Sequence, residues 1–172
     1  MPPRKLLFSL LAALAFGLAS AASARADTVV FSSRAAFTAA AAGLTTIDFG
    51  GIAPPSSVAN FSSPLTLQGV TFSGSPTGAI SVIDPGFFNP LFQFESGAVL
   101  GGFAFIEVTL PPGVTALGAD IMSTNPDGRS FEVVLSTGEV FVVGTPARPG
   151  RGFFGLTSDV ATRQPERITV GP

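Results

Sequence analysis

Beyond Gly43, the chain consists of short apolar segments that alternate with polar residues and are separated by Gly, Pro, Asn and Ser. A strand with one buried face alternates in this way, because successive side chains point to opposite sides of a sheet. In the segment 103–110, for example, Ile106 and Val108 share one face and Glu107 lies on the other. Closely spaced segments of this kind are typical of a sandwich or barrel. The sequence therefore predicts an antiparallel, all-β domain.

We expect about eight strands in this part of the chain, enough for two sheets packed face to face. The expected strands cover residues 44–49, 65–72, 79–83, 103–110, 114–122, 131–135, 139–143 and 153–156. The sequence Ser136-Thr137-Gly138 indicates a hairpin between two of them. Within the segment 65–72 the apolar residues change parity at Gly69, which predicts a β-bulge.

One short helix is expected before the strands. Thr28 to Phe31 reads as a short strand, and it is followed by Ser residues, an alanine-rich stretch and Gly43. A Ser at the N-cap and a Gly just beyond the end are start and stop signals for a helix. We expect Phe31 and Phe37 to hold this helix against the sheet.

Residues 1–26 have the pattern of a secretory signal peptide. Arg4 and Lys5 form a basic start, residues 6–18 are apolar, and small residues lead up to Ala26. The apolar stretch is too short to span a bilayer comfortably, so we expect cleavage rather than retention as a membrane anchor. The predicted mature protein is a single domain, residues 27–172, secreted to the periplasm or the extracellular space and without a membrane span.

The residue types that the chain lacks limit the chemistry that it can perform. It contains no Cys, His, Trp or Tyr, whereas Phe occurs 17 times. Without Cys, stability must come from the hydrophobic core and not from disulfides. Without His, there is no imidazole base, no Ser-His-Asp triad and no His-ligated zinc site. Most familiar hydrolase sites are thereby excluded.

The charge of the predicted mature domain argues against nucleic acid and anionic membranes as partners. It keeps all 11 acidic residues of the chain but has only six arginines and no lysine. A net negative surface repels phosphate backbones and anionic lipid. We therefore expect neither nucleic-acid binding nor electrostatic docking to a membrane.

The order of landmarks along the chain resembles a group of bacterial exported β-sandwich proteins that often end in a PEP-CTERM sorting tail. The matching pieces are Phe31-x-x-Arg34-Ala35-x-Phe37, Ile47-Asp48-Phe49, Gly69-Val70-Thr71-Phe72-Ser73, Leu110-Pro111-x-Gly113-Val114-x-Ala116-x-Gly118 and Phe153-Phe154-Gly155-x-x-Ser158-Asp159. The resemblance implies a jelly-roll-like antiparallel β-sandwich at the exopolysaccharide-rich cell surface. It implies no established catalytic residues.

The chain departs from this group at two places. Gly50 stands where the group usually continues with an acidic residue, and the chain ends at Pro172 without the sorting tail. Residues 162–167 are polar and contain a proline, so only Ile168 and Val170 are available for a closing strand. We therefore expect a sandwich that is truncated at its C-terminal edge, with one short or missing edge strand.

A first candidate site is a calcium site. Its ligands would be the oxygen-bearing residues near the ends of neighbouring strands, since hard oxygen ligands suit this ion: Asp120, Asn125, Asp127 and Asp159. Their spacing matches no EF-hand loop. The alternative is that Asn125 and Asp127 form a turn and Asp120 points outward from a strand, and this reading predicts no metal and no other cofactor.

A second candidate is a pair of carboxylates of the kind that glycosidases use, drawn from Glu95, Glu107, Asp120 and Glu132. Such enzymes need one acid with a raised pKa and one ionised partner at a set separation. The alternative is that these carboxylates are solvated on the outer faces of strands.

The third candidate is the aromatic segment 87–94, which contains Phe87, Phe88, Phe92 and Phe94. A large exposed apolar patch marks a contact surface for a ligand or partner. The alternative is that a turn at Asn89-Pro90 folds these rings over the open end of the sandwich as core.

The sequence favours a non-catalytic exported surface or extracellular-matrix protein that contacts exopolysaccharide. The carbohydrate part of this prediction rests on Phe alone, because Trp and Tyr, which combine stacking with a polar group, are absent. The alternative is an enzyme that acts on glycans with carboxylates or calcium. Carboxylates that converge in a cleft would favour the enzyme, and carboxylates spread over outer faces would favour a binding or structural protein.

Overall fold

The structure, a computed structural model, describes residues 28–75, 79–87, 97–102, 104–124, 126–148, 150–158 and 167–171. The predicted signal peptide lies outside these residues. The elements, in order, are β1 (Thr28–Phe31), α2 (Arg34–Ala40), β2 (Val58–Phe61), β3 (Leu65–Leu67), β4 (Val70–Ser75), β5 (Ile80–Ile83), β6 (Val99–Gly102), β7 (Phe105–Thr109), β8 (Ala116–Ile121), β9 (Arg129–Leu135), β10 (Val140–Thr145), β11 (Gly152–Ser158) and β12 (Arg167–Gly171).

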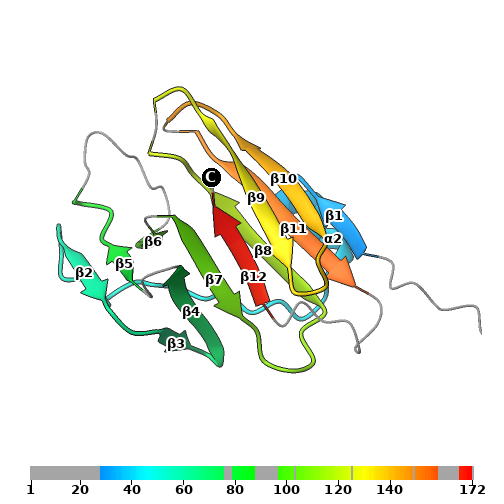
Figure 1. Cartoon of the computed structure of the whole chain (residues 1–172), viewed down its shortest axis with the longest axis horizontal. Coiled ribbons are helices and arrows are strands. Elements are labelled where there is room, and N and C mark those ends of the chain that lie inside the picture. Colours follow the sequence, from blue (N-terminus) through cyan, green and yellow to red (C-terminus); the bar gives the residue numbers. More distant parts are fainter. Residues whose placement is uncertain are drawn as a thin grey trace, which may run out of the picture.

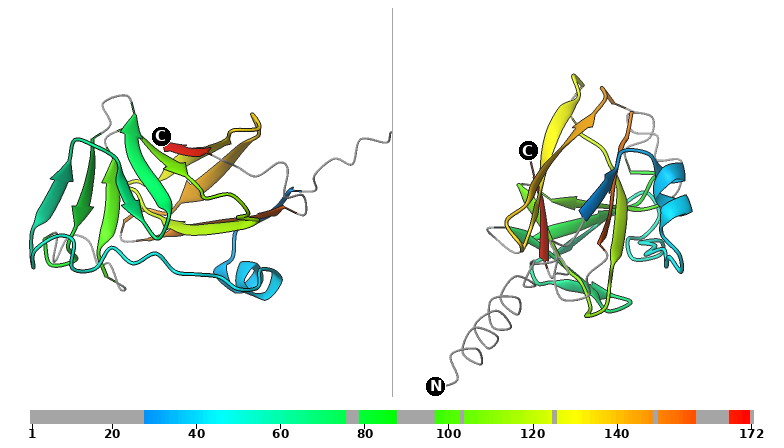
Figure 2. Two further views of the ribbon diagram at one scale, coloured as in Figure 1. Left: turned by 90° about the horizontal axis from the view of Figure 1, so that it is seen from below. Right: turned by 90° about the vertical axis from the view of Figure 1, so that its right-hand side faces the viewer.

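The strands form three antiparallel sheets instead of the expected two. The large sheet has the order β10-β9-β12-β7-β4-β3, the back sheet has the order β1-β11-β8, and the small sheet has the order β2-β5-β6. The small sheet lies at one end of the molecule (Figure 1). Figure 2 shows the back sheet between helix α2 and the large sheet. The predicted all-β, sandwich-like fold with one short helix is confirmed, and the jelly-roll connectivity stays a prediction.

The core lies between the large sheet and the back sheet. Phe141 of β10 and Phe154 of β11 come from opposite sheets, and their ring centroids are 6.0 Å apart. Val133 is fully buried and Leu156 is 1% exposed. The buried cluster consists of Val70, Phe72, Ile80, Leu110, Val133, Leu135, Val143, Phe154 and Leu156. The alternation read from the sequence of β9 is therefore correct, since Val133 and Leu135 are buried and Glu132 is exposed.

The third sheet arises because one long two-stranded ribbon bends. β4 pairs with β7 in the large sheet, and their continuations β5 and β6 pair with each other in the small sheet. Glycines stand on both sides of the bend. A Cβ at Gly74 would overlap the carbonyl oxygen of Ala79, and a Cβ at Gly102 would lie 2.7 Å from Ile106. The close approach of the two segments therefore needs glycine at these positions.

The last described strand, β12, lies inside the large sheet. Ile168 pairs with Leu135 of β9 on one side and with Val108 of β7 on the other. We expected the last strand to be a short or missing strand at the edge of a sheet, but β12 is an interior strand. The five residues of β12, Arg167–Gly171, are enough to fill the space between β9 and β7.

The strand expected at residues 44–49 is wrong. Residues 44–49 form no strand, although Ile47 and Phe49 pack against the core and the Phe49 ring lies 5.4 Å from that of Phe72. Residues 44–49 therefore alternate because one side of this extended segment packs against the core, and not because the segment pairs in a sheet. The polar segment after it contains β2, whose Asn60 accepts a hydrogen bond from Ser81 of β5 at 2.7 Å.

The parity change at Gly69 is a hairpin turn and not a bulge. β3 and β4 are joined by Gln68 and Gly69, with φ of 51° and 82°, and Leu67 lies opposite Val70. Two consecutive residues with positive φ form the type I′ turn that fits the twist of a hairpin. Residues paired across such a hairpin share a face even though their numbers differ in parity, which explains the sequence pattern.

Helix α2 is held against the back sheet by one ring. The Ser33 hydroxyl accepts from the Ala36 N–H as the predicted N-cap, and Phe37 is 5% exposed. Phe37 lies over Gly118 and Gly155, which are paired across β8 and β11. A Cβ at either glycine would come within 2.8 Å of the Phe37 ring. Phe31 and Phe153 flank this ring at 5.8 and 5.7 Å, so the predicted role of Phe31 and Phe37 is confirmed.

We expect Phe37→Ala to lower the free energy of unfolding by about 3 kcal/mol, because it removes a buried ring and leaves a cavity. Val29→Ala is the matched control, since Val29 lies on the neighbouring strand β1 but is 46% exposed. Its expected loss is below about 1 kcal/mol. Urea denaturation of both variants checks this, and equal small losses would contradict the docking of α2 through Phe37.

A second prediction concerns the hairpin turn. Gly69→Ala should cost about 1 kcal/mol, because φ of 82° strains any residue with a Cβ, while the nearest atom to that Cβ is an unstrained 3.8 Å away. Gly144→Ala in β10 should cost nothing, since its Cβ would have no neighbour within 4 Å. Thermal unfolding distinguishes the two. A harmless Gly69→Ala would argue against the type I′ turn.

Candidate functional site

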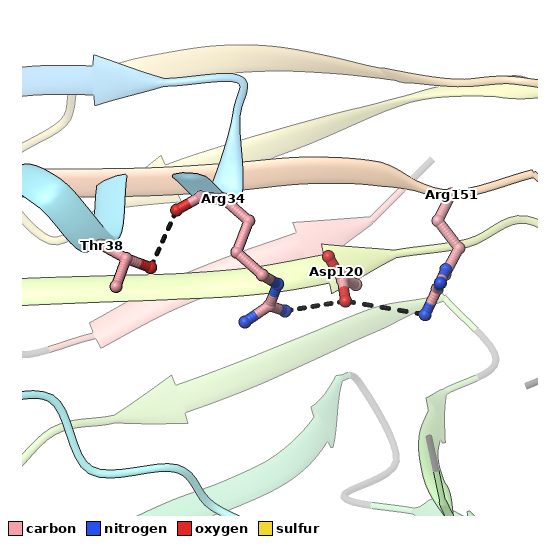
Figure 3. A network of polar contacts seen from close by, with 4 residues as sticks. All are labelled: Arg34, Thr38, Asp120 and Arg151. Atoms are coloured by element: carbon pink, nitrogen blue, oxygen red, sulfur yellow. Dashed lines mark hydrogen bonds and ion pairs between the residues drawn. The ribbon is translucent and has the colours of Figure 1, made fainter. Parts of the chain in front are cut away.

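A small network of charged side chains lies on the outer face of the back sheet (Figure 3). Arg34, the first residue of α2, donates from Nη2 to Oδ2 of Asp120 on β8 at 2.7 Å. Arg151 Nη1 lies 3.9 Å from the same oxygen. The side chains of Arg34 and Asp120 are 61% and 32% exposed. One carboxylate therefore lies between two guanidinium groups at the surface.

The ring of Phe153 supports this network. Asp120 is paired with Phe153 across β8 and β11, and the Arg34 guanidinium carbon lies 5.1 Å from the centre of the ring. A cation over an aromatic face is attracted by the ring quadrupole, by roughly 0.5–1 kcal/mol at an exposed site. Helix α2 orients Arg34, and the Arg34 carbonyl accepts from Thr38 Oγ1 at 2.9 Å. Stacking and ion pairing thus fix the orientation of the Arg34 side chain.

The structure describes two of the four residues of the predicted calcium site. Asp120 is engaged by two arginines, and Asp127 is exposed in the turn that contains Pro126. Asn125 and Asp159 lie outside the described residues. Across the described ranges, no group of three or more acidic side chains is arranged to hold a metal ion. The surroundings of Asp120 favour the alternative reading, an outward strand residue.

Of the candidate carboxylates of a glycosidase-like pair, Asp120 lies on a different face from Glu107 and Glu132. Asp120 lies on the outer face of the back sheet, on the same side as α2. Glu107 and Glu132 lie on the outer face of the large sheet, on β7 and β9, with β12 between these strands. Glu107 is half-buried and lies 3.5 Å from the Ser73 hydroxyl, whereas Glu132 is exposed. Glu95 falls outside the described residues.

The aromatic segment is described only at its start. Phe87 ends a turn in which its N–H donates to the Asp84 carbonyl at 3.0 Å, and its side chain is 47% exposed. This side chain is not part of the core at that position. Phe88, Phe92 and Phe94 lie outside the described residues, so the surface proposed for this segment stays a prediction.

One charged surface was not found by sequence analysis. Strand β8 ends, β9 begins, β10 ends and β11 begins at the same end of the sandwich (Figure 1). Arg129 begins β9, Arg148 and Arg151 lie between β10 and β11, and Arg34 reaches Asp120 near the end of β8. Arg34 and Arg151 meet at Asp120, while Arg129 and Arg148 are placed at this end by their strand and loop. We call these four residues the arginine end.

Side-chain contacts to backbone carbonyls, together with close backbone packing, connect the loops and strands of the arginine end. Arg148 Nη1 lies 3.5 Å from the Thr124 carbonyl oxygen, which connects the loop before β11 to the loop after β8. A Cβ at Gly128 would come within 2.6 Å of the Thr145 carbonyl oxygen. The Thr145 hydroxyl, in turn, donates to the Arg129 carbonyl at 3.0 Å. The available sequence signal was that three arginines flank strand ends, but only the sheet order brings those ends together.

Among the described residues, no helix has the length and apolar character that crossing a membrane requires. Comparison of the chain with models of protein families, with curated proteins and with solved structures found no match.

Proposed function

We propose that this chain is a non-catalytic exported domain that acts at the cell surface or in the extracellular matrix and contacts exopolysaccharide. The observation that carries the proposal is the placement of the described carboxylates. Asp120 is bound to Arg34 on one outer face, and Glu107 and Glu132 lie on the opposite outer face. Acid catalysis of glycoside cleavage needs two carboxylates on either side of one bond. Asp120 is on the wrong face to pair with either glutamate, and β12 lies between the strands that carry Glu107 and Glu132, which favours a non-catalytic role.

The rest of the proposal rests on the sequence. A secretory signal at residues 1–26 would export the domain, and the missing Cys and His remove disulfides and imidazole chemistry outside the cell. The resemblance to exported β-sandwich proteins supports a role at the bacterial surface. A sandwich stabilised by packing alone presents broad outer faces, which suits contact with an extended polymer better than enclosure of a small substrate.

Electrophoresis through gels that contain bacterial exopolysaccharides tests this function. We expect at least one polymer to retard the chain and expect no release of reducing ends during prolonged incubation. The matched pair of variants is Glu107→Gln and Glu139→Gln, since Glu139 lies in the β9–β10 turn, where it accepts from Thr137 at 2.9 Å. Both variants should be retarded like the unmodified chain.

Two results would contradict the proposal. Release of reducing ends that Glu107→Gln abolishes and Glu139→Gln preserves would identify an enzyme. A rise in melting temperature with saturating calcium that disappears in Asp127→Ala would identify a calcium site, because an ion that binds only the native state stabilises it by mass action. We expect no calcium-dependent shift.

A further inference from the structure

The charges of the described residues are unevenly distributed. All four arginines whose side chains the structure describes belong to the arginine end, and Asp120 and Asp127 are the acidic residues there. The other described carboxylates lie elsewhere: Asp48, Asp84, Glu107, Glu132 and Glu139. An acidic protein thus has one surface on which positive charge prevails. Its overall negative charge does not cancel this surface, because charges more than about 8–10 Å apart are largely screened at physiological ionic strength.

The chemistry of arginine selects the ligand. A guanidinium group is planar and always charged, and its N–H groups match the two oxygens of a carboxylate. The pair between Arg34 and Asp120, at 2.7 Å, is an example of this geometry with a carboxylate of the protein itself. Arg34 uses one of its nitrogens in that bond and is 61% exposed, while Arg129 and Arg151 are exposed residues. Further carboxylates presented by a polymer can therefore approach the same surface from solvent.

The rigidity of the surface favours binding over nonspecific attraction. Arg34 is oriented by Phe153 and Asp120, and the Arg148 guanidinium contacts the Thr124 carbonyl. The backbone of Arg129, at the start of β9, is held by the Thr145 hydroxyl. Guanidinium groups that are already positioned lose less conformational entropy when a ligand orders them. The arginines also come from α2, β9 and the loop before β11, so they face a ligand that extends over several elements and not a single small anion.

We propose that the arginine end binds polysaccharides that carry carboxylates, that is, polyuronates. This inference rests on the proposed function, which assigns polysaccharide contact without naming the chemical class. The carboxylates of successive uronate units supply the repeated negative charges that several arginines on one surface can pair with. Neutral glucans lack these groups and are not ligands of this surface.

The test measures retardation of the full chain in gels that contain polygalacturonate, with dextran as the neutral polymer. We expect retardation by polygalacturonate that weakens as salt is raised, and none by dextran. The double variant Arg129→Gln/Arg148→Gln should bind roughly tenfold more weakly, since two charged contacts are lost. Circular dichroism and thermal unfolding of the variant report whether its fold is retained.

A charge-matched control separates local charge from net charge. The double variant Ser136→Glu/Thr137→Glu changes the net charge by the same amount, but at the β9–β10 turn, at the opposite end of these strands. It should bind polygalacturonate like the unmodified chain. The inference would be overturned if the arginine double variant bound polygalacturonate as tightly as the unmodified chain does. It would also be overturned if both double variants lost the same amount of affinity.

The outcomes also distinguish this inference from the proposed function. Retardation by dextran or another neutral polysaccharide, without retardation by polygalacturonate, would leave polysaccharide contact standing and exclude the arginine end as its site. Failure of every polysaccharide to retard the chain would contradict both. If the arginine double variant loses its fold, Arg129→Lys/Arg148→Lys replaces it in the test. This variant keeps both positive charges, so it should retain most of the salt-dependent retardation. It should bind less tightly than the unmodified chain, because Lys lacks the planar guanidinium group.

Discussion

The position of β12 in the middle of the large sheet is the constraint on which the rest of the structure depends. β12 pairs with β9 on one side and β7 on the other, and these two strands are not paired with each other. Without it, the β9–β10 hairpin would be separated from β7, β4 and β3. Ile168 of β12 pairs with Leu135 of β9 and with Val108 of β7. The row of apolar residues on the inner face of the large sheet therefore passes through β12. A continuous core face therefore requires the strand that is described last in the chain.

This arrangement also connects the core to the arginine end. β9 and β10 bring Arg129 and the loop after Thr145 to the end of the back sheet. Arg151, in this loop, lies close to Asp120 of β8. Phe141 of β10 and Phe154 of β11 join the two sheets. If the β9–β10 hairpin were released, the arginines of the two sheets would separate. The proposed polyuronate surface thus depends on packing far from the charges, and folding that pairs such distant segments is expected to be slow.

Local sequence patterns predicted much of this fold because the deciding interactions are local. The β9–β10 hairpin follows from alternation and from a turn that ends in Gly138, and α2 follows from its Ser33 cap and alanine-rich body. The errors come from features that depend on the tertiary structure. Residues 44–49 alternate like a strand but lack a pairing partner, and the bend that creates the small sheet depends on close approach at Gly74 and Gly102.

The candidate site was predicted less well for the same reason. Asp120 was correctly identified as an outward strand residue, but nothing near it in the sequence indicates that Arg34, 86 residues away, would pair with it. Arg129, Arg148 and Arg151 carry no motif. They become one surface only when the order of the strands places their ends together, and that order depends on where β12 inserts, which the sequence of β12 alone does not reveal.

The most direct measurement of the central role of β12 compares Ile168→Asn with Thr169→Asn by urea denaturation. Both residues lie in the same strand, but Ile168 occupies the register position between the core residues Leu135 and Val108, and Thr169 the one between Val134 and Glu107. We predict that Ile168→Asn lowers the free energy of unfolding by about 3 kcal/mol or more, since it replaces an apolar residue with an amide in the row that joins Leu135 and Val108. Thr169→Asn should cost less than about 1 kcal/mol. Equal, small effects of the two substitutions would contradict the placement of β12 inside the large sheet.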